Sequence, residues 1–261
     1  MFEKNFLLDN QATIISYMVS GKKEMQTTGT DLKIRRKTRL KRLVRWLIID
    51  IIVTIVVISL LIYRPGRYKP LDSFSQDYEQ GEVSTYLTHQ LSPQIYNGTQ
   101  RGEPFDIIIT QDGVNDIISR LNWPIQSGGI MLYDPAALFV PGTVVLMGTA
   151  EIKKVELVIT IELEPKIDEE GLINLHVSKV KVGAVNVTPL ARMTAQNMYT
   201  ERLAAANVDA NALQTKIAAS LFNDEPFEPV FTIDGKKVRV ESVVVGQSEL
   251  KARLVPVSAR R

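Results

Sequence analysis

Two aspartates one helical turn apart are the side chains whose type and spacing come closest to chemistry. Asp112 and Asp116 would share one face of a helix, where a carboxylate pair can divide the roles of acid and base. A capping acid followed by a solvated acid explains the same spacing without any reaction. The chain lacks the serine-hydrolase, zinc-protease, phosphate-loop and dinucleotide motifs, and no nucleophile–base set stands out. We therefore expect no catalytic residues and no enzyme.

Metal and cofactor sites are equally hard to assemble from this sequence. The acidic run 168–170 lacks the alternating oxygen ligands of a calcium loop and is typical of a polar turn. The chain has no cysteine and only two histidines, His89 and His176, which excludes common zinc sites and thiol catalysis. His176 alternates with apolar neighbours, as an ordinary strand residue does. We expect no metal and no cofactor.

An apolar run from Trp46 to Tyr63 divides the chain into two unlike parts. Its 18 residues, at about 1.5 Å each, span roughly 27 Å, which is close to the hydrocarbon thickness of a bilayer. A buried core element would rarely be this long without a polar face. A cleaved signal peptide would start nearer Met1 and would be followed by a small-x-small site. We predict a single transmembrane helix over 46–63.

The charges that flank this run predict its orientation. Residues 1–45 hold 11 Lys and Arg against 4 Asp and Glu, whereas the rest of the chain holds 20 against 25. The positive-inside rule places the basic arm, 1–45, in the cytoplasm and the larger C-terminal part outside. The arm would meet anionic headgroups, while the acidic folded part argues against nucleic acid as a partner. A domain of this size without cysteine suits the inner membrane of a bacterial cell.

A short tether and one folded domain are expected after the helix. A Pro-Gly pair stops the helix at the outer face, so that 64–74 forms the tether and 75–261 the extracytoplasmic domain. The spacing of apolar residues predicts a helix over 75–91. We expect this helix to end at Pro93, with a loop over 97–104.

A strand followed by an amphipathic helix is the most regular block of the domain. Phe105–Ile109 has the composition of a strand, and Thr110 or Asp112 is expected to cap the helix that follows. Apolar side chains recur there at helical spacing and would cover one face. They are Val114, Ile117, Ile118 and Leu121, and Trp123-Pro124 closes the block.

From Ile130 onward the hydrophobic period changes to two, which predicts antiparallel strands. The expected strands cover 130–140, 143–151, 152–164 and 172–182. In the third strand Leu157, Ile159 and Ile161 alternate with Glu and Thr, so one face of the sheet should be dry and the other wet. A change of phase near Ser178-Lys179 predicts a bulge.

The C-terminal part continues with helices and a hairpin. Helices are expected from Thr188 to about Ala206 and from Asp209 onward. Strands over 230–233 and 237–245 form a hairpin, and 250–255 is the last strand. The fold class is therefore α+β, with a single N-terminal transmembrane helix followed by a curled antiparallel sheet packed with a few helices.

Three short patterns in the domain are distinctive. The first is a strand, then Thr110, then Val114-Asn115 and Ile117-Ile118. The second is KVGAVNVTP, at 181–189, and the third is the closing hairpin with Ile233-Asp234 and 240–243. Together they resemble membrane-anchored bacterial proteins of the YpmS type, which are similar to the tubular lipid-binding (TULIP) superfamily. Gly113 departs from the pattern, which prefers a helix former there. An extra helix after Thr188 also departs from it.

This resemblance implies a long curled sheet wrapped on a helix, with an apolar groove that holds an acyl chain of a membrane lipid. The candidate lipid-binding residues are Ile117, Ile118, Leu121 and Trp123 on the helix, and Leu157, Ile159 and Ile161 on the third strand. The same residues could form an ordinary core. The alternative function is a structural or scaffolding protein of the cell envelope, which binds a protein partner and has no small-molecule ligand. An internal cavity would favour the first function and an exposed sheet edge the second.

Overall fold

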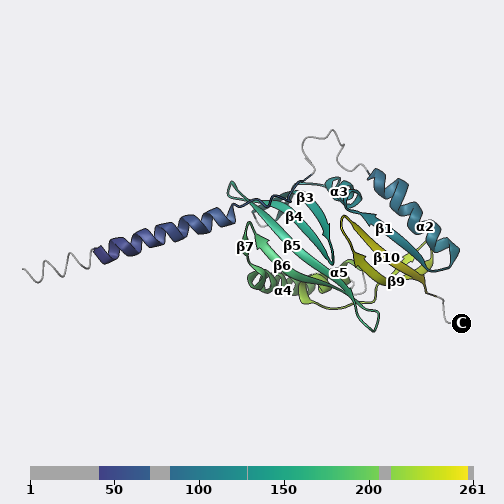
Figure 1. Ribbon diagram of the computed structural model, residues 1–261. Coiled ribbons are helices and arrows are strands. Elements are labelled where there is room, and N and C mark those ends of the chain that lie inside the picture. The colour runs from purple at the N-terminus through teal and green to yellow at the C-terminus, as the bar shows by residue number, and fades with distance from the viewer. Residues whose placement is uncertain (1–40, 71–82, 128, 206–212, 258–261) are drawn as a thin grey trace, which may run out of the picture. The chain divides into compact units, whose positions relative to one another are not determined.

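The computed structural model describes residues 41–70, 83–127, 129–205 and 213–257 (Figure 1). The chain divides into two units, Met1–Ile58 and Ser59–Arg261. Among the described residues one helix, Lys41–Leu61, is long and apolar enough to cross a membrane, with a mean hydropathy of 2.5. The helix begins before Trp46, so its first turn contains basic residues that precede the apolar run. It ends before Tyr63.

The second unit is built from short helices and antiparallel strands. Its helices are η1 (Leu87–Leu91), α2 (Ser92–Arg101), α3 (Gln111–Ser119), α4 (Thr188–Ala205) and α5 (Leu213–Asn223). Its strands are β1 (Phe105–Thr110), β2 (Ile125–Ser127), β3 (Ile130–Val140), β4 (Thr143–Ile152), β5 (Val155–Ile167), β6 (Ile173–Val182), β7 (Val185–Asn186), β8 (Val230–Ile233), β9 (Lys236–Val245) and β10 (Glu249–Pro256). The expected helix start at Asp209 lies outside the described residues.

The strands form two antiparallel sheets. The four-stranded sheet has the order β1-β10-β9-β8, and the six-stranded sheet has the order β2-β3-β4-β5-β6-β7. The α+β class is confirmed, but the expectation of one curled sheet is wrong. The first strand is the reason, because β1 pairs with the C-terminal strand β10, with Ile107 opposite Ala252. Helix α3 then carries the chain away from β1 to the six-stranded sheet (Figure 1).

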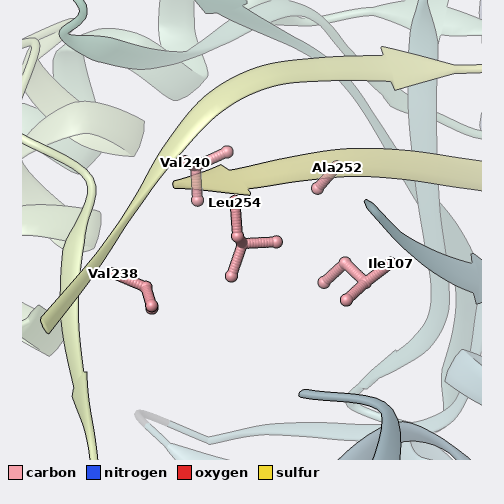
Figure 2. Close-up of a cluster of buried hydrophobic side chains, with 5 residues drawn as sticks. All are labelled: Ile107, Val238, Val240, Ala252 and Leu254. Carbon is pink, nitrogen blue, oxygen red and sulfur yellow. The ribbon is translucent and has the colours of Figure 1, made fainter. Parts of the chain in front are cut away.

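The four-stranded sheet has its own buried apolar cluster. Figure 2 shows its five side chains, from β1, β9 and β10, with Ile107 and Leu254 extending toward one another. Val238 on β9 is completely buried. Ile95 of α2 packs against this cluster, as does Ile167 of β5, so the cluster joins the sheet to α2 and to the six-stranded sheet.

The helical segment before β1 continues past the point where the sequence predicted its end. We expected Pro93 to stop the helix, but α2 runs through Pro93 to Arg101, so the expected loop over 97–104 is wrong as well. Pro93 lies inside a continuous helical run from Thr85 to Arg101, at the point where η1 passes into α2. The π-helical turn η1 comes directly before it and widens the backbone at that point, which accommodates the proline ring.

Helix α3 begins as predicted, and the structure explains the unusual glycine at its start. Thr110 is the N-cap, and its hydroxyl accepts a hydrogen bond from the Gly113 N–H at 3.2 Å. The ring of Tyr86 lies against Gly113, and a Cβ on this glycine would stand 2.4 Å from the ring. A helix former is therefore excluded at position 113, because the Tyr86 ring occupies its space.

The central strand β5 confirms one expectation and corrects another. The predicted bulge is present, because Glu162 pairs with Lys179 and Leu163 with Val177, which leaves Ser178 as the extra residue. The expected wet face of β5 is not wet along its whole length. Val158 and Thr160, which belong to that face, are 2% and 6% exposed. The hydroxyl of Tyr68 is hydrogen-bonded to the hydroxyl of Thr149 on this face of the sheet. Thr149 of β4 is the register partner of Val158.

Candidate functional site

An apolar cavity of about 190 Å³ lies between the six-stranded sheet and the helices α4 and α5. From the sheet it is lined by Leu146, Ile161, Leu163, Val177 and Val180. From the helices it is lined by Ala191, Arg192, Ala195, Leu221 and Phe222. Apart from Arg192, every lining side chain is a hydrocarbon, so the cavity matches an apolar ligand.

The sheet wall of the cavity follows from strand register. Leu146, Ile161 and Val180 are direct partners across β4, β5 and β6, so their side chains stand side by side on one face. The bulge at Ser178 restores the alternation of β6, so that Val177 points to the same face as Val180. Three strands thus present a continuous aliphatic surface.

The helix wall is left open by small side chains. Ala191 and Ala195 are one turn apart on α4, and both line the cavity. Interiors are normally packed without voids larger than a water molecule. Larger residues at these two positions would fill the hollow. The cavity is nevertheless smaller than the roughly 300–1,000 Å³ of typical small-molecule sites, so it suits part of a chain and not a whole lipid.

Arg192 is the charged group at this cavity. Its side chain is exposed, and one guanidinium nitrogen, Nη2, donates a 2.8 Å hydrogen bond to the carbonyl oxygen of Val177. A guanidinium has further donors in a planar fork that suits carboxylate or phosphate groups. An apolar hollow with a cation beside it can hold a hydrocarbon chain and the acidic head that the chain carries.

The structure distributes the residues that the sequence singled out over several places. Ile161 lines the cavity, and Leu157 and Ile159 lie on the same face of β5. Ile117 and Leu121 line another hollow, of about 260 Å³, together with Leu87 of η1. The carbonyl oxygen of Ile118 accepts a 2.7 Å hydrogen bond from the Trp123 indole. The α3 residues and the β5 residues therefore do not line one common cavity.

The residues that complete the cavity were missed by reasoning from the sequence. Leu221 and Phe222 of α5 and the two alanines of α4 are four of the ten residues that line it. The available signal was the pair of alanines at a spacing of four on a helix that follows the sheet. Such a pair is typical of a close helix contact or of a hollow, and the sequence does not distinguish the two.

Side chains cover the free edge of β3, the strand next to α3. The Asn115 side chain donates to the Ala137 carbonyl oxygen at 2.9 Å and accepts from the Ala137 N–H at 2.7 Å. Gln111 accepts from the N–H of Phe139 at 2.9 Å. These amides take the place of a neighbouring strand, and they satisfy the backbone groups that an edge would otherwise expose.

The edge of β1 in the four-stranded sheet is covered in the same way. The Tyr86 hydroxyl accepts from the N–H of Thr110 at 3.0 Å and donates to the carbonyl oxygen of Ile108 at 3.4 Å. The Gln94 side chain accepts from the N–H of Ile108 at 3.2 Å.

Helix residues also cover the edge of β6 beside the cavity. The buried hydroxyl of Ser220 accepts from the N–H of Leu175 at 2.8 Å, and Arg192 donates to Val177. The Thr188 hydroxyl accepts from the N–H of Val180 at 2.8 Å. These contacts fix α4 and α5 on the strand that lines the cavity.

The two aspartates with helical spacing have different surroundings. Asp112 is exposed, whereas the Asp116 carboxylate accepts hydrogen bonds from the Ser84 hydroxyl and from Arg120 Nε, the latter at 2.9 Å. Burial alone would raise the pKa of Asp116, but these hydrogen bonds outweigh burial and hold the pKa below its usual value. A carboxylate held in its charged form joins the residues just before η1 to α3 and is not suited to act as a general acid.

Nothing else in the described part of the chain gathers ligands for a metal, since no group of three His, Asp or Glu side chains comes together there. Comparisons with models of protein families, with curated proteins and with solved structures find no significant match for this chain. The resemblance to tubular lipid-binding proteins therefore stays a prediction.

Proposed function

We propose that this protein is a single-pass protein of the bacterial inner membrane whose extracytoplasmic domain binds the acyl chain of a lipid. The observation that carries this proposal is the apolar cavity between the six-stranded sheet and the helices α4 and α5. The helix Lys41–Leu61 would be the anchor, with the basic N-terminal arm in the cytoplasm. The ligand is a membrane lipid, and no catalysis is involved.

Burial of hydrocarbon would supply the affinity. Each methylene that leaves water for an apolar site contributes about 0.8 kcal/mol. A lipid already in the membrane gains less from the same transfer, so the cavity would extract chains weakly. The anchor offsets this, because it keeps the domain beside a high local concentration of lipid. Arg192 would pair with an acidic head group that stays at the surface.

The covered strand edges favour lipid over a scaffolding role that depends on strand addition. A partner that adds a strand needs free N–H and C=O groups on an edge. On β1, β3 and β6 side chains already bond to such groups, including those of Ile108, Ala137 and Leu175. The residues that line the cavity, in contrast, carry hydrocarbon side chains, apart from Arg192.

Photocrosslinking with a fatty acid that carries a diazirine tests the proposal. The full chain is reconstituted in nanodiscs with this probe, illuminated, digested and mapped by mass spectrometry. We expect crosslinks in two places, on the helix Lys41–Leu61 and on the peptides that contain Ile161 and Leu221. Crosslinks on the helix alone would refute the cavity as a lipid site.

A variant that fills the cavity gives the matched comparison. Ala195→Phe places a ring in the hollow and should lower the crosslinking of the cavity peptides several-fold, while the membrane helix keeps its crosslinks. Thr194→Phe adds the same ring to the neighbouring exposed position of α4 and should change neither. Equal crosslinking of the cavity peptides in both variants would contradict the proposal.

A further inference from the structure

Exposed aliphatic residues gather at the tip of the β4–β5 hairpin. Ile152 ends β4 and Val155 begins β5, and the two residues are register partners. Ile130 of β3 pairs with Ile152 on the other side. All three side chains are substantially exposed, at 37%, 38% and 47% for Ile130, Ile152 and Val155. Three adjacent strands therefore end in one apolar patch, which we call the hairpin tip.

Two lysines form the turn of the same hairpin. Lys153 and Lys154 have φ angles of +49° and +69°, the left-handed conformation of a two-residue hairpin turn. Asparagine and glycine adopt this conformation more easily than lysine does. Lys153 and Lys154 thus adopt a backbone conformation that is unfavourable for lysine. They lie next to the exposed side chains of Ile152 and Val155. Local strain of this kind is typical of sites with a function.

The chain from Leu60 onward is attached to the same end of the sheet. The carbonyl oxygen of Leu60 accepts a 2.8 Å hydrogen bond from the N–H of Ala184, in the turn after β6. Gly183 permits this contact, because a Cβ there would lie 2.3 Å from the carbonyl oxygen of Leu61. Arg64 forms an ion pair with Glu156, the residue after Val155.

Further along, the tether is fixed through Tyr68. Its hydroxyl donates to the carbonyl oxygen of Asp134 at 2.7 Å and lies 2.8 Å from the Thr149 hydroxyl. Glu156 also accepts a hydrogen bond from Tyr133, and burial together with this bond raises the pKa of Tyr133 to about 12. The described part of the tether is thus held on β3, β4 and β5, and Leu60 is held on the turn after β6.

From these contacts we infer that the hairpin tip docks on the surface of the membrane in which the helix is anchored, with its aliphatic side chains among the headgroups. The bilayer is the occupant that the structure favours, because the tip is tied to the residues where the helix leaves the bilayer. Lys153 and Lys154 match anionic headgroups, and the aliphatic residues match the acyl boundary. The inference rests on the anchoring part of the proposed function and is independent of the cavity.

Docking at the tip would set the orientation of the whole sheet. Strand β5 has 13 residues, and at about 3.4 Å per residue it reaches roughly 40 Å from its tip. The turn 168–171 lies at its other end. One strand therefore offers two positions that differ greatly in their expected distance from the bilayer.

Depth-dependent fluorescence quenching tests this inference with the full chain. The protein has no cysteine, so Val155→Cys, Glu169→Cys and Ile52→Cys each create one labelling site for bimane. The labelled chains are placed in nanodiscs of phosphatidylcholine and phosphatidylglycerol that contain either a headgroup-level or a deep nitroxide lipid. We expect quenching at position 155 to exceed quenching at position 169 several-fold, with position 52 reporting the anchor.

The outcomes separate docking from anchoring. Equal, weak quenching at positions 155 and 169, with strong quenching at 52 by a deep nitroxide lipid, would overturn docking and leave the anchor in place. Weak quenching at 52 by the deep nitroxide lipid would overturn both. The variant Lys153→Gln with Lys154→Gln should lower quenching at position 155 about twofold without changing position 52. Unchanged quenching at 155 would refute the attraction of these lysines to anionic headgroups.

Discussion

Replacement of Asn115 by leucine removes the side chain that replaces a neighbouring strand on β3. Both hydrogen bonds to Ala137 are lost, and each is worth about 0.5–1.5 kcal/mol net. Ala137 is only 3% exposed, so its N–H and C=O have little access to water once the amide is gone. Such groups cost about 1–3 kcal/mol each when buried without a partner. We expect Asn115→Leu to lower the free energy of unfolding by about 2–4 kcal/mol.

The sign of the stability change distinguishes an effect on the β3 edge from an effect on the helix α3. Leucine is a better helix former than asparagine, so a loss of stability at position 115 comes from the strand edge and not from α3 itself. For a domain of 150–250 residues a loss of about 3 kcal/mol lowers the unfolding midpoint by roughly 6–12 °C. The exposed edge of β3 would also make the folded or partly folded chain prone to aggregate.

Tryptophan fluorescence follows this unfolding directly. The chain has two tryptophans, and Trp46→Phe leaves Trp123, whose indole is bonded to the last turn of α3. The full chain is melted in detergent, with Asn97→Leu as the control, because Asn97 is exposed on α2. That control should stay within about 0.5 kcal/mol of the parent. If Asn115→Leu is as stable as Asn97→Leu, the reasoning about the covered edge is refuted.

Three further substitutions test other parts of the fold by the same melting experiment. Gly113→Ala places a Cβ 2.4 Å from the Tyr86 ring and should cost about 1–3 kcal/mol; an additive effect when it is combined with Tyr86→Ala would contradict the proposed clash. Val238→Ala empties part of a fully buried position and should cost about 2 kcal/mol, and a neutral result would show that the cluster of Figure 2 is not tightly packed. The pKa of Asp116 is lowered in the folded chain, because its hydrogen bonds outweigh burial. The carboxylate therefore contributes its full stabilisation above the pKa of an unfolded aspartate, which is near 4. This stabilisation is lost as the pH falls through the lower pKa of the folded state. Asp116→Asn should therefore be less stable than wild type at pH 7 and equal to it in strong acid, whereas a constant difference at all pH values would exclude the carboxylate charge as the cause.

Local patterns in the sequence predicted most of the strands and helices. The alternation along β5 predicted that strand, and the phase change near Ser178 predicted the bulge in β6, because a one-residue bulge leaves a direct trace in hydrophobic period. The helix cap at Thr110 was also predicted correctly, because it depends only on residues close in sequence. Pro93 misled, because the π-helical turn that accommodates it has no comparable signature in sequence.

The candidate site was less predictable, since it depends on contacts between distant segments. The pairing of β1 with β10 split the expected single sheet, and no local pattern specifies which strands pair. Ile161 was expected near a ligand and does line the cavity, but its opposite wall comes from Ala195 and Leu221, which the resemblance did not point to. The edge contact of Asn115 was also missed, because its partner Ala137 lies on a strand that the sequence shows only as apolar.

Native mass spectrometry of the full chain tests the central claim, that the cavity beside α4 holds an acyl chain. Wild type, Ala195→Phe and Thr194→Phe are released from the same detergent micelles at increasing collision energy. The account predicts that wild type and Thr194→Phe keep one lipid more than Ala195→Phe at energies that strip the annular lipids. Equal lipid retention by all three proteins would contradict it, and the cavity would then be an unfilled part of the core.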